Sequence, residues 1–464
     1  MRILIHGLNF SPELVGVGKF TGEMAEWLAK HGHEVHVVTA PPFNPASRVS
    51  EGYSAWSYRR EHQRSKVEPW NPSAGRAATG MATAREELSA SSPATAGILT
   101  CEVERSDDVQ DGSLTVFRCP VWVPATPSAG KRILHLASFA FSSFWSMIAQ
   151  ISWRPDVVLV IEPTLLCAPN AWITAQFCGA KSWIHIQDLE TDAAFELGIL
   201  RSSWLRWLLL GAEAKCLQSF HRVSTISQKM GSRVLKKGVR DQQYVQFPNW
   251  VNTQAIFPLA NPSSMRDELG IPRDAIVSLY SGTMAQKQGL EILRGAVEKL
   301  QTKKDLHFVF CGDGPGRSAL TELGAKCRNV HFVGLQPISR LNDLLNLADI
   351  HLLPQRADAA DLVMPSKLTG MLASGRPVVV SAARDTQLAH VVEGCGIVVP
   401  PGDTSAFAWA IEELTGHSAL REKFGRNGRA YAVANLERNV ILGRFEEELR
   451  RLVSNSDGGE RLSN

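Results

Sequence analysis

The feature that most constrains this chain is a regular alternation of short Val- and Ile-rich runs with segments of helical apolar spacing. In the first half we expect strands at residues 2–5, 34–39, 114–118, 157–161, 181–186, 223–226 and 244–247. In the second half we expect them at residues 276–281, 306–311, 330–333, 350–353, 377–381 and 396–399. Apolar runs that alternate with helices are typical of parallel sheets covered on both faces. The sequence therefore predicts an α/β fold with two doubly wound, Rossmann-like sheets.

The chain has 464 residues, which is too long for one ordinary hydrophobic core. Strand patterning stops near Phe247, where prolines gather. We therefore expect domains at 1–252 and 253–440 that face each other across a cleft, followed by a helix and polar tail at 441–464. Residues 62–112 are rich in Ala, Ser, Thr, Gly and Pro without an apolar period, which predicts a loosely ordered insertion.

Composition excludes several classes of protein. A formal net charge of +3 with 20% charged residues gives no basis for binding nucleic acid. The eight cysteines include no Cys-x-x-Cys pair, so neither a disulfide framework nor a zinc site is indicated. A reducing cytoplasm fits this cysteine usage.

The longest apolar stretch spans residues 133–153. His135, Gln150 and several serines interrupt it, so it falls short of the roughly 18–20 apolar residues of a membrane span. Lys131 and Arg132 precede it, and its Phe, Trp and Met content is that of a helix at a membrane surface. A core helix of the α/β domain and an interfacial helix both stay open.

The loop after the first strand carries Gly16 and Gly18, which permit close approach of a ligand to the backbone. The spacing superficially matches a dinucleotide fingerprint, but about ten residues separate it from the strand, and the second strand ends without the acidic residue that binds ribose. Lys19 is followed by Phe20, where a P-loop needs Ser or Thr. A dehydrogenase and an ATP-hydrolysing P-loop protein are disfavoured.

A phosphate site is predicted in the second half. Pro365 suits the first turn of a helix, Ser366 adds a hydroxyl, and Lys367 adds a positive charge at that helix start. Lys287 and the Gly312-Asp313-Gly314 turn follow two other strands of the same sheet. Because ligands of open α/β sheets bind at the carboxyl ends of strands, we expect these loops to meet one phosphate-bearing ligand. Asp313 is expected to cap a turn.

In the first half, His185 and Asp188 end the strand at 181–186 and are expected to face the same cleft. Such a pair can act as a base, a sugar-hydroxyl acceptor or a charge stabiliser. His185 alternates with Ile184 and Ile186, so an interior histidine without a catalytic part stays an alternative.

Several short motifs stand in a fixed order: Pro12-Glu-Leu-x-Gly-x-Gly-Lys19, His185-Ile-Gln-Asp188, Phe247-Pro-Asn-Trp250, Ser281-Gly with Lys287-Gln-Gly289, Gly312-Asp-Gly314 and Met364-Pro-Ser-Lys-Leu-Thr369. Together they resemble the retaining GT-B glycosyltransferases. Within these, the chain is similar to the colanic-acid fucosyltransferases and the O-antigen fucosamine transferases. The likeness covers almost the whole chain apart from the insertion and the tail.

The resemblance implies a nucleotide-sugar donor on the C-terminal domain and a lipid-linked oligosaccharide acceptor on the N-terminal one. It implies retention of anomeric configuration, no cofactor and no required metal, and a donor linked to GDP in preference to UDP, with fucose or a related deoxysugar. It also implies a cytoplasmic enzyme of exopolysaccharide synthesis with peripheral contact to the inner membrane left open. Lys287 matches the lysine that neutralises the donor diphosphate, and Asp188 or the leaving phosphate would take the acceptor proton.

The chain departs from the wider group at three places. Thr283 replaces an arginine, and Gln187 stands where a histidine is often found. The paired glutamates are absent, with Asp361 one place before the first position, and Lys367 is the candidate substitute cation. Two rival classes stay open: a sugar-nucleotide epimerase, which needs no acceptor, and a non-catalytic scaffold of a polysaccharide assembly complex.

Overall fold

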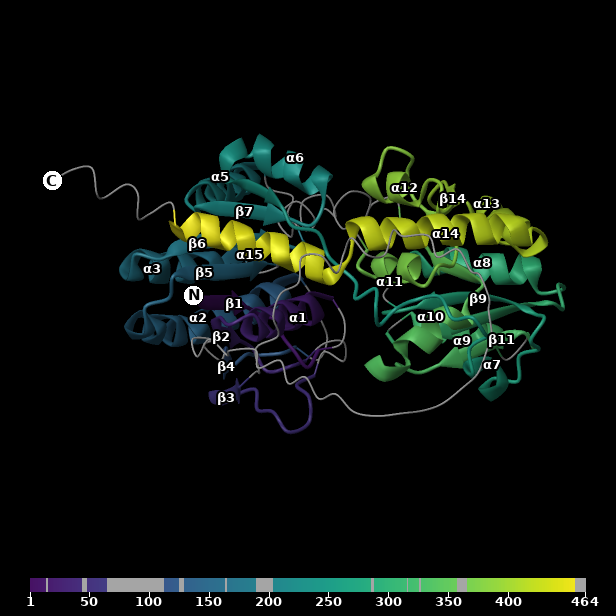
Figure 1. Cartoon of the computed structure of the whole chain (residues 1–464), viewed down its shortest axis with the longest axis horizontal. Helices are drawn as coiled ribbons and strands as arrows, with labels where there is room; N and C mark the ends of the chain where they lie inside the picture. Colours follow the sequence, from purple (N-terminus) through teal and green to yellow (C-terminus); the bar gives the residue numbers. More distant parts are fainter. Residues whose placement is uncertain are drawn as a thin grey trace, which may run out of the picture.

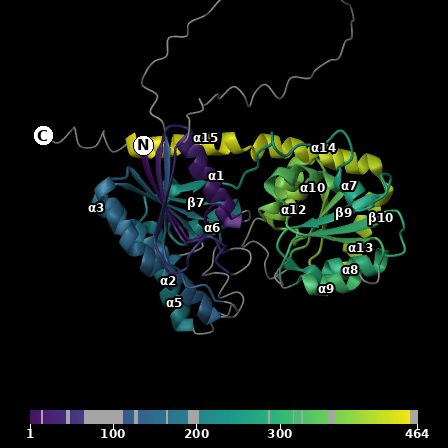
Figure 2. The same cartoon turned by 90° about the horizontal axis from the view of Figure 1, so that it is seen from below.

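The chain forms two α/β halves that lie side by side in a computed structural model (Figure 1). The structure describes residues 1–13, 16–43, 48–64, 112–124, 129–162, 165–188, 203–284, 288–314, 316–324, 327–356 and 365–454. Each half is built on one twisted sheet with helices on both faces (Figure 2). The predicted pair of Rossmann-like sheets is confirmed.

The first sheet has eight strands in the order β3-β4-β2-β1-β5-β6-β7-β8. Their bounds are β1 Arg2–Gly7, β2 Glu34–Thr39, β3 Arg59–Arg64, β4 Ser113–Arg118, β5 Val157–Glu162, β6 Lys181–Ile186, β7 Arg222–Thr225 and β8 Tyr244–Gln246. All neighbours run parallel except β3, which pairs antiparallel with β4 at the sheet edge. The strand β5 is buried along its whole length, as its Val- and Ile-rich sequence predicts.

The edge strand β3 corrects the sequence prediction, which assigned an all-parallel sheet and began the insertion at residue 62. Its sequence, Arg-Arg-Glu-His-Gln-Arg, carries no apolar residue, so only its pairing with β4 makes it a strand. The rest of the expected insertion, residues 65–111, lies outside the described residues.

Helices cover both faces of the first sheet. One hydrophobic cluster joins one face to α2 Ala129–Ala149, α3 Ala168–Cys178, α5 Ser203–Gln218 and α6 Gln228–Lys236. A second cluster joins the other face to α1 Gly16–Lys30 and α15 Arg438–Ser454. Among the described residues, no helix is both long enough and apolar enough to span a membrane.

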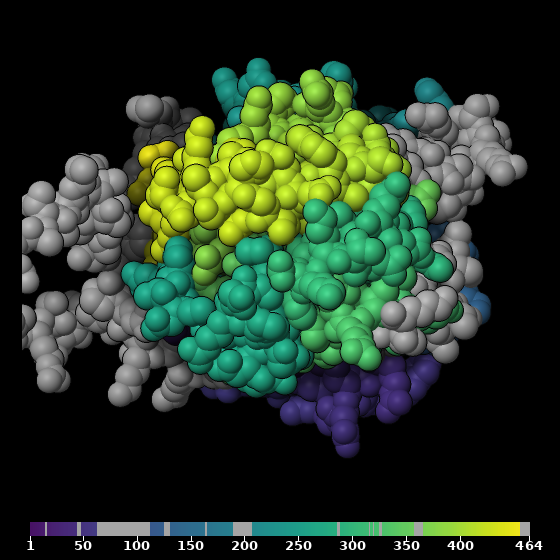
Figure 3. All heavy atoms as spheres, turned by 90° about the vertical axis from the view of Figure 1, so that its right-hand side faces the viewer, coloured from purple at the N-terminus to yellow at the C-terminus, as the bar shows by residue number. Residues whose placement is uncertain are grey.

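The second sheet has six parallel strands in the order β11-β10-β9-β12-β13-β14. Their bounds are β9 Ile276–Ser281, β10 Leu306–Cys311, β11 Val330–Val333, β12 Ile350–Leu353, β13 Val378–Ser381 and β14 Gly396–Val399. Its helices are α7 Met265–Glu268, α8 Leu290–Leu300, α9 Arg317–Gly324, α10 Leu341–Leu347, α11 Lys367–Ala373, α12 Gln387–Val392, α13 Thr404–Gly416 and α14 Ser418–Asn435. Residues of the last helices, yellow in Figure 3, cover the upper part of this half.

The C-terminal helix α15 returns to the first half. Phe445 stacks on Phe247 with ring centroids 4.3 Å apart and meets Trp183 edge-on at 5.0 Å. The ring nitrogen of His33 lies 2.9 Å from the carboxylate of Glu446 on the same helix. The two halves are therefore joined twice, by the segment after β8 and by the passage from α14 to α15 (Figure 1).

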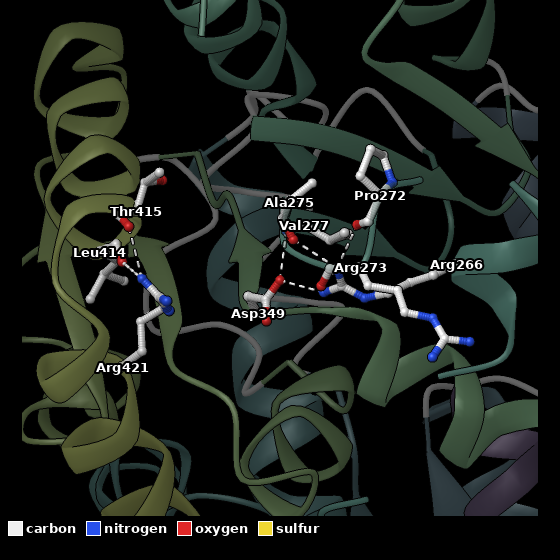
Figure 4. A network of polar contacts seen from close by, with 9 residues as sticks. All are labelled: Arg266, Pro272, Arg273, Ala275, Val277, Asp349, Leu414, Thr415 and Arg421. Atoms are coloured by element: carbon white, nitrogen blue, oxygen red, sulfur yellow. Dashed lines mark hydrogen bonds and ion pairs between the residues drawn. The ribbon is translucent and has the colours of Figure 1, made fainter. Parts of the chain in front are cut away.

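The amino-terminal edge of the second sheet is held by a partly buried ion pair (Figure 4). Arg266 of α7 donates to Asp349 at 2.6 Å and to the carbonyl of Ala275 at 2.7 Å. The same carboxylate oxygen of Asp349 accepts from the backbone N–H of Val277 at 2.8 Å. This network fixes the starts of β9 and β12, whose opposite ends carry the loops of the candidate site.

Candidate functional site

Lys367, the first residue of α11, lies against the end of β9. Its amine donates to the phenol oxygen of Tyr280 at 3.0 Å and lies 4.5 Å from the centre of that ring. The phenol of Tyr280 in turn donates to the carbonyl of Thr283 at 2.7 Å. Burial lowers the pKa of Lys367 to about 7, because few groups near the amine replace its lost hydration. The lysine is therefore held in place, and among the residues that the structure describes it has no charged partner.

The residue that makes room for Lys367 is Gly282. A Cβ at this position would lie 2.4 Å from Cε of Lys367, and the backbone φ of +132° is one that other residues rarely adopt. A side chain at residue 282 would displace the lysine. The loop after β9 therefore leaves space for the side chain of Lys367.

The glycine turn after β10 packs directly on the loop after β9. A Cβ at Gly312 would lie 2.0 Å from the carbonyl oxygen of Gly282, and one at Gly314 would lie 2.6 Å from that of Met284. The backbone N–H of Met284 donates to the carbonyl of Asp313 at 2.8 Å. These glycines are needed for contact between the two loops, which form one continuous surface beside Lys367. We call this surface, residues 282–284 and 312–314, the ledge.

Three other predicted donor-site residues, Asp313, Pro365 and Ser366, contribute less to this ledge. Asp313 is exposed, and its carboxylate accepts from the backbone N–H of Gly314 at 2.8 Å, as in a turn. Pro365 and Ser366 precede α11, because the helix begins at Lys367 and not at the expected Pro365. The backbone N–H of Leu368 donates to the carbonyl of Pro365 at 3.1 Å, which closes a turn before the helix. With seven residues, α11 has a small dipole, so the charge of Lys367 carries most of the field.

The predicted site residues Lys287 and Asp361 lie outside the described residues. Of the predicted donor-site residues that the structure describes, Gly312 and Gly314 pack on the loop after β9, and Lys367 lies against the same loop at Gly282.

Gly16 and Gly18 lie at the start of α1 and differ in their surroundings. A Cβ at Gly16 would meet nothing within 4 Å, whereas one at Gly18 would lie 2.5 Å from a carboxylate oxygen of Glu13. Glu13 is buried and accepts from the side chain of Asn9 at 3.0 Å and from the backbone of Phe43 at 3.1 Å. Gly18 is required by this packing, which the sequence reasoning did not foresee.

His185 lies inside the first half, at 2% exposure. Its Nδ1 is 2.9 Å from the hydroxyl of Ser224, and its Nε2 is 3.1 Å from the side-chain amide of Gln187. Burial lowers its pKa to about 3, so the ring is neutral at physiological pH. These contacts favour a structural part for His185, holding Gln187, over the catalytic part expected from the sequence. Asp188 follows β6 and is half-buried.

A cavity of about 900 Å³ lies between the two halves. The N-terminal half contributes residues of α6 and the segment after β8, and the C-terminal half contributes the α11 start and α12. Lys229 and Asp385 form an ion pair between the halves at 3.9 Å. The described residues that line the cavity carry amides, hydroxyls and cations but no carboxylate, as with Gln228, Lys229, Gln246, Asn249, Thr369, Gln387, His390, Tyr431 and Arg444. Such a lining suits a polar, uncharged or anionic ligand.

A second cavity of about 360 Å³ lies at the carboxyl edge of the second sheet. It is lined by residues after β12, β13 and β14 and by the start of α8, including Gly289, Glu291, Arg356, Ser381 and Gly402. The hydroxyl of Ser381 bonds both backbone groups of Gln355 at 2.9 Å and so holds one wall of the cavity. Its volume is within the roughly 300–1,000 Å³ range of small-molecule sites. Among the described residues, no group of three or more His, Cys, Asp or Glu side chains is placed to hold a metal.

Sequence reasoning missed Tyr280 and Gly282. Tyr280 reads as an ordinary apolar strand position, and Gly282 reads as a turn residue. Tyr280 and Gly282 matter because they contact Lys367, which is 87 residues away along the chain from Tyr280. The sequence around them therefore gives no indication of this role.

Two family models match the chain. Residues 15–250 match a glycosyl transferase 4-like domain, and residues 275–417 match glycosyl transferases group 1. The chain is 35% identical over 460 residues to the provisionally assigned colanic acid biosynthesis glycosyl transferase WcaI of Escherichia coli (strain K12), covering 97% of this chain and 100% of that protein. It is 30% identical over 173 residues to the alpha-D-kanosaminyltransferase of Streptomyces kanamyceticus, which covers 36% of this chain and 43% of that protein.

Solved structures share the fold at low identity. A sucrose-phosphate synthase of Thermosynechococcus elongatus superposes with a TM-score of 0.68 at 17% identity, over 98% of this chain and 99% of that one. WaaG, a glycosyltransferase involved in lipopolysaccharide biosynthesis, gives 0.61 at 16% identity, over 96% and 99%. Anabaena HepE in complex with UDP and glucose gives 0.62 at 14% identity, over 97% and 100%. At these identities the likeness concerns the fold alone.

Proposed function

The chain belongs to the glycosyltransferase family of the group 1 and 4-like domains, and on that premise we propose that it moves a sugar from a nucleotide-sugar to a lipid-linked oligosaccharide. The full-length relative supports a place in the synthesis of an extracellular polysaccharide of the colanic acid type. Fucose or a related deoxysugar is the proposed group, carried by GDP.

The observation that carries this proposal is the ledge of two loops beside Lys367. When the anomeric bond breaks, negative charge develops on the leaving diphosphate, and a fixed cation lowers the energy of that state. Lys367 is held there by Tyr280, and among the described residues it forms no ion pair that the ligand would have to displace. Lys287, which follows the same loop in the sequence, would add a second cation.

The cavity of about 360 Å³ is the proposed place of the nucleoside, because it opens at the same strand edge as the ledge. Asp361 and Ser366, which precede α11 in the sequence, are proposed donor contacts. Without the family's usual glutamate pair, ribose would be bound by other groups, and Glu291 and Arg356 line this cavity.

The proposed chemistry retains the anomeric configuration through attack on the face from which the diphosphate leaves. Asp188 or the leaving phosphate takes the proton of the acceptor hydroxyl. His185 acts through Gln187, which it holds at 3.1 Å, and remains neutral during the reaction. No metal or cofactor has a part in this scheme.

The cavity between the halves is the proposed acceptor site, since its lining suits a saccharide and its phosphate. A lipid-linked acceptor would be presented at the cytoplasmic face of the inner membrane, so the proposal places the enzyme there.

Nucleotide release from GDP-fucose and UDP-glucose, with and without a lipid-linked saccharide, tests the proposal. A transferase releases nucleotide only with acceptor and loses this activity in Lys367→Met. Loss of activity in Asp188→Asn would assign the proton acceptor to Asp188, and retained activity would assign it to the leaving phosphate. An epimerase converts the donor without acceptor, and a scaffold does neither. Either of these outcomes would overturn the proposal.

A further inference from the structure

A cavity of about 1160 Å³ lies at the amino ends of the strands of the second sheet. Asp349 and Pro377, which directly precede β12 and β13, form one side of it. The other sides come from α14, the first turns of α15 and Pro258 of the segment after β8. The helix α11 begins at Lys367 and ends two residues before Gly375, which lines the cavity. The cavity and the ledge therefore lie at opposite ends of this short helix.

One stripe of α14 faces this cavity. Arg421, Gly425 and Arg429 follow one another at a spacing of four residues, so they share one side of the helix. A Cβ at Gly425 would lie 2.1 Å from the carbonyl oxygen of Gly375, so the backbone of α14 packs directly on the turn before Arg376. Figure 4 shows Arg421 on α14, bonded to carbonyls at the end of α13. The packing of α14 therefore brings its arginines close to Arg376.

The charged part of the lining is mostly arginine. Its charged residues are Arg376, Arg421, Arg426, Arg429 and Arg444, with Asp349 and Glu422. Each of the two carboxylates already has a partner. Asp349 is bound to Arg266 at 2.6 Å, and Glu422 is paired with Arg426 at 3.6 Å. Neither carboxylate is therefore left over for the other arginines.

Most arginines of the lining keep their charge uncompensated. Arg421 and Arg429 donate to backbone carbonyls, which satisfy their N–H groups without cancelling their charge. Arg444 lies exposed on α15. In the described part of the chain, only Arg426 of the five arginines forms an ion pair. The cavity therefore has an excess of positive charge.

Arg376 is the residue that most needs an anion. Its Nε is buried and has no hydrogen-bond partner among the described residues. Burial lowers the pKa of its guanidinium; Asp349 raises this pKa, and the charges of Arg266 and Arg421 lower it further. Three cations thus act on one carboxylate that Arg266 already binds. A buried donor in a native fold normally has a partner, and a buried cation without one is unstable.

We propose that this cavity binds a small phosphate-bearing anion, with its phosphate oxygens on the guanidinium groups of Arg376 and Arg421. The planar fork of arginine matches the oxygens of phosphate in paired hydrogen bonds. Because four arginines of the lining lack an ion pair, a ligand with two or more negative charges, such as a diphosphate, fits best. Pro258, Val433 and Val440 leave apolar surface for an organic part of the ligand.

The place of the cavity links the anion to both halves of the chain. Pro258 belongs to the first connection between the halves, and Arg444 belongs to α15, which forms part of the second. Arg444 also lines the cavity between the halves. A bound anion contacts both connections at once, so it is expected to raise the thermal midpoint of the chain.

Calorimetric titration of the full chain with inorganic diphosphate, without magnesium and at low salt, tests the proposal. Since the ledge is a second place for diphosphate, the titration is made in Lys367→Met. This variant is expected to bind diphosphate, and to bind it less tightly as salt is added. Adding Arg376→Met is expected to weaken binding at least about tenfold, because the charge-assisted hydrogen bonds of Arg376 are lost.

Arg294→Met in the same background is the matched control. Arg294 is a half-exposed arginine on α8, paired with Glu298 at 3.0 Å, and it does not line the cavity. Its replacement should leave diphosphate binding unchanged. Arg444→Met, which changes an exposed side chain, should weaken binding and serves if Arg376→Met does not fold.

The stability of the variants without anion separates a binding arginine from a structural one. Arg376→Met removes a cation that lies near two others, so the thermal midpoint should stay the same or rise. Arg429→Met loses bonds to three backbone carbonyls and should lower the midpoint. A lowered midpoint in Arg376→Met equal to that in Arg429→Met would contradict a binding role for Arg376.

Two results of the titration would overturn the proposal. One is absence of diphosphate binding in Lys367→Met, and the other is undiminished binding after Arg376→Met is added. Citrate is the comparison ligand, because it carries several carboxylates and no phosphate. Tighter binding of citrate than of diphosphate would overturn the assignment to phosphate.

Discussion

The amine of Lys367 lies 3.0 Å from the phenol oxygen of Tyr280, over a glycine whose missing side chain leaves the space that the lysine occupies. Lys367 starts a helix after the fourth strand of its half, and Tyr280 is the last residue but one of the first strand. Their contact turns two separate strand ends into one cationic ledge, on which the account of donor binding depends.

Donor binding should take up a proton. Burial lowers the pKa of Lys367 to about 7 in the free protein, and a diphosphate beside the amine favours its charged form and raises that pKa. Near pH 8 the free amine is mostly neutral and the bound amine charged, so affinity falls as pH rises above 7. Calorimetry of GDP binding in buffers of different ionisation enthalpy measures this uptake. Binding of normal strength without proton uptake at pH 8 would rule out this part for Lys367.

Gly282→Ala should abolish tight donor binding, because the new Cβ would lie 2.4 Å from Cε of Lys367. The matched control is Gly179→Ala, where φ is also positive, at +66°, but nothing lies within 4 Å. The control should cost about 1–2 kcal/mol of stability through backbone strain alone and leave nucleotide affinity unchanged. The measurement is a nucleotide titration of both variants, and wild-type affinity in Gly282→Ala would contradict the arrangement.

Arg266→Met should destabilise the second half. It leaves the partly exposed carboxylate of Asp349 without its 2.6 Å partner and with the N–H of Val277 alone, which costs about 1–3 kcal/mol. Arg273→Met removes an exposed pair with Asp267 at 3.4 Å and should change stability by less than about 0.5 kcal/mol. Urea unfolding of both variants is the measurement, and equal effects would contradict a structural part for the Arg266 network.

Stability should fall in mild acid. Burial lowers the pKa of His6, His185 and His351 to about 3, against about 6.5 in the unfolded chain. Between these values the unfolded state binds more protons, so stability is complete above pH 6.5 and is lost as pH falls. One pH unit below 6.5 costs roughly 1.4 kcal/mol for each such histidine.

The acid effect is measured by urea unfolding at pH 7.5 and 5.5. His351→Asn should reduce the difference between the two values, since asparagine does not titrate. Equal stability at both pH values would show that these histidines are not neutral in the fold.

The strand framework was predictable because each strand carries its own signal. The expected runs at 276–281 and 306–311 coincide with β9 and β10, since a buried parallel strand is an apolar run closed by a turn residue. The strand β3 has no such apolar run and forms by pairing with β4. For α2, the apolar periods of a core helix and of an interfacial helix are alike, and only the neighbours on each side distinguish them.

The site was predictable in part. The sequence indicated Lys367 and the glycine turn at residue 312, because open α/β sheets bind ligands at the carboxyl ends of their strands. It could not indicate that Tyr280 holds the amine, that Gly18 makes room for Glu13, or that α15 returns to the first sheet. Each of these depends on residues distant in the sequence, whose meeting only the folded chain decides.

The most direct test of the account is a thermal-shift panel of GDP, UDP and their sugar conjugates on the wild type and on Lys367→Met. A ligand at a hundredfold excess over its dissociation constant stabilises the fold by about 2.7 kcal/mol, which such an assay detects. The account predicts that one nucleotide family, GDP by our proposal, raises the midpoint of the wild type and not of the variant. A shift that persists undiminished in Lys367→Met, or no shift by any nucleotide, would contradict it.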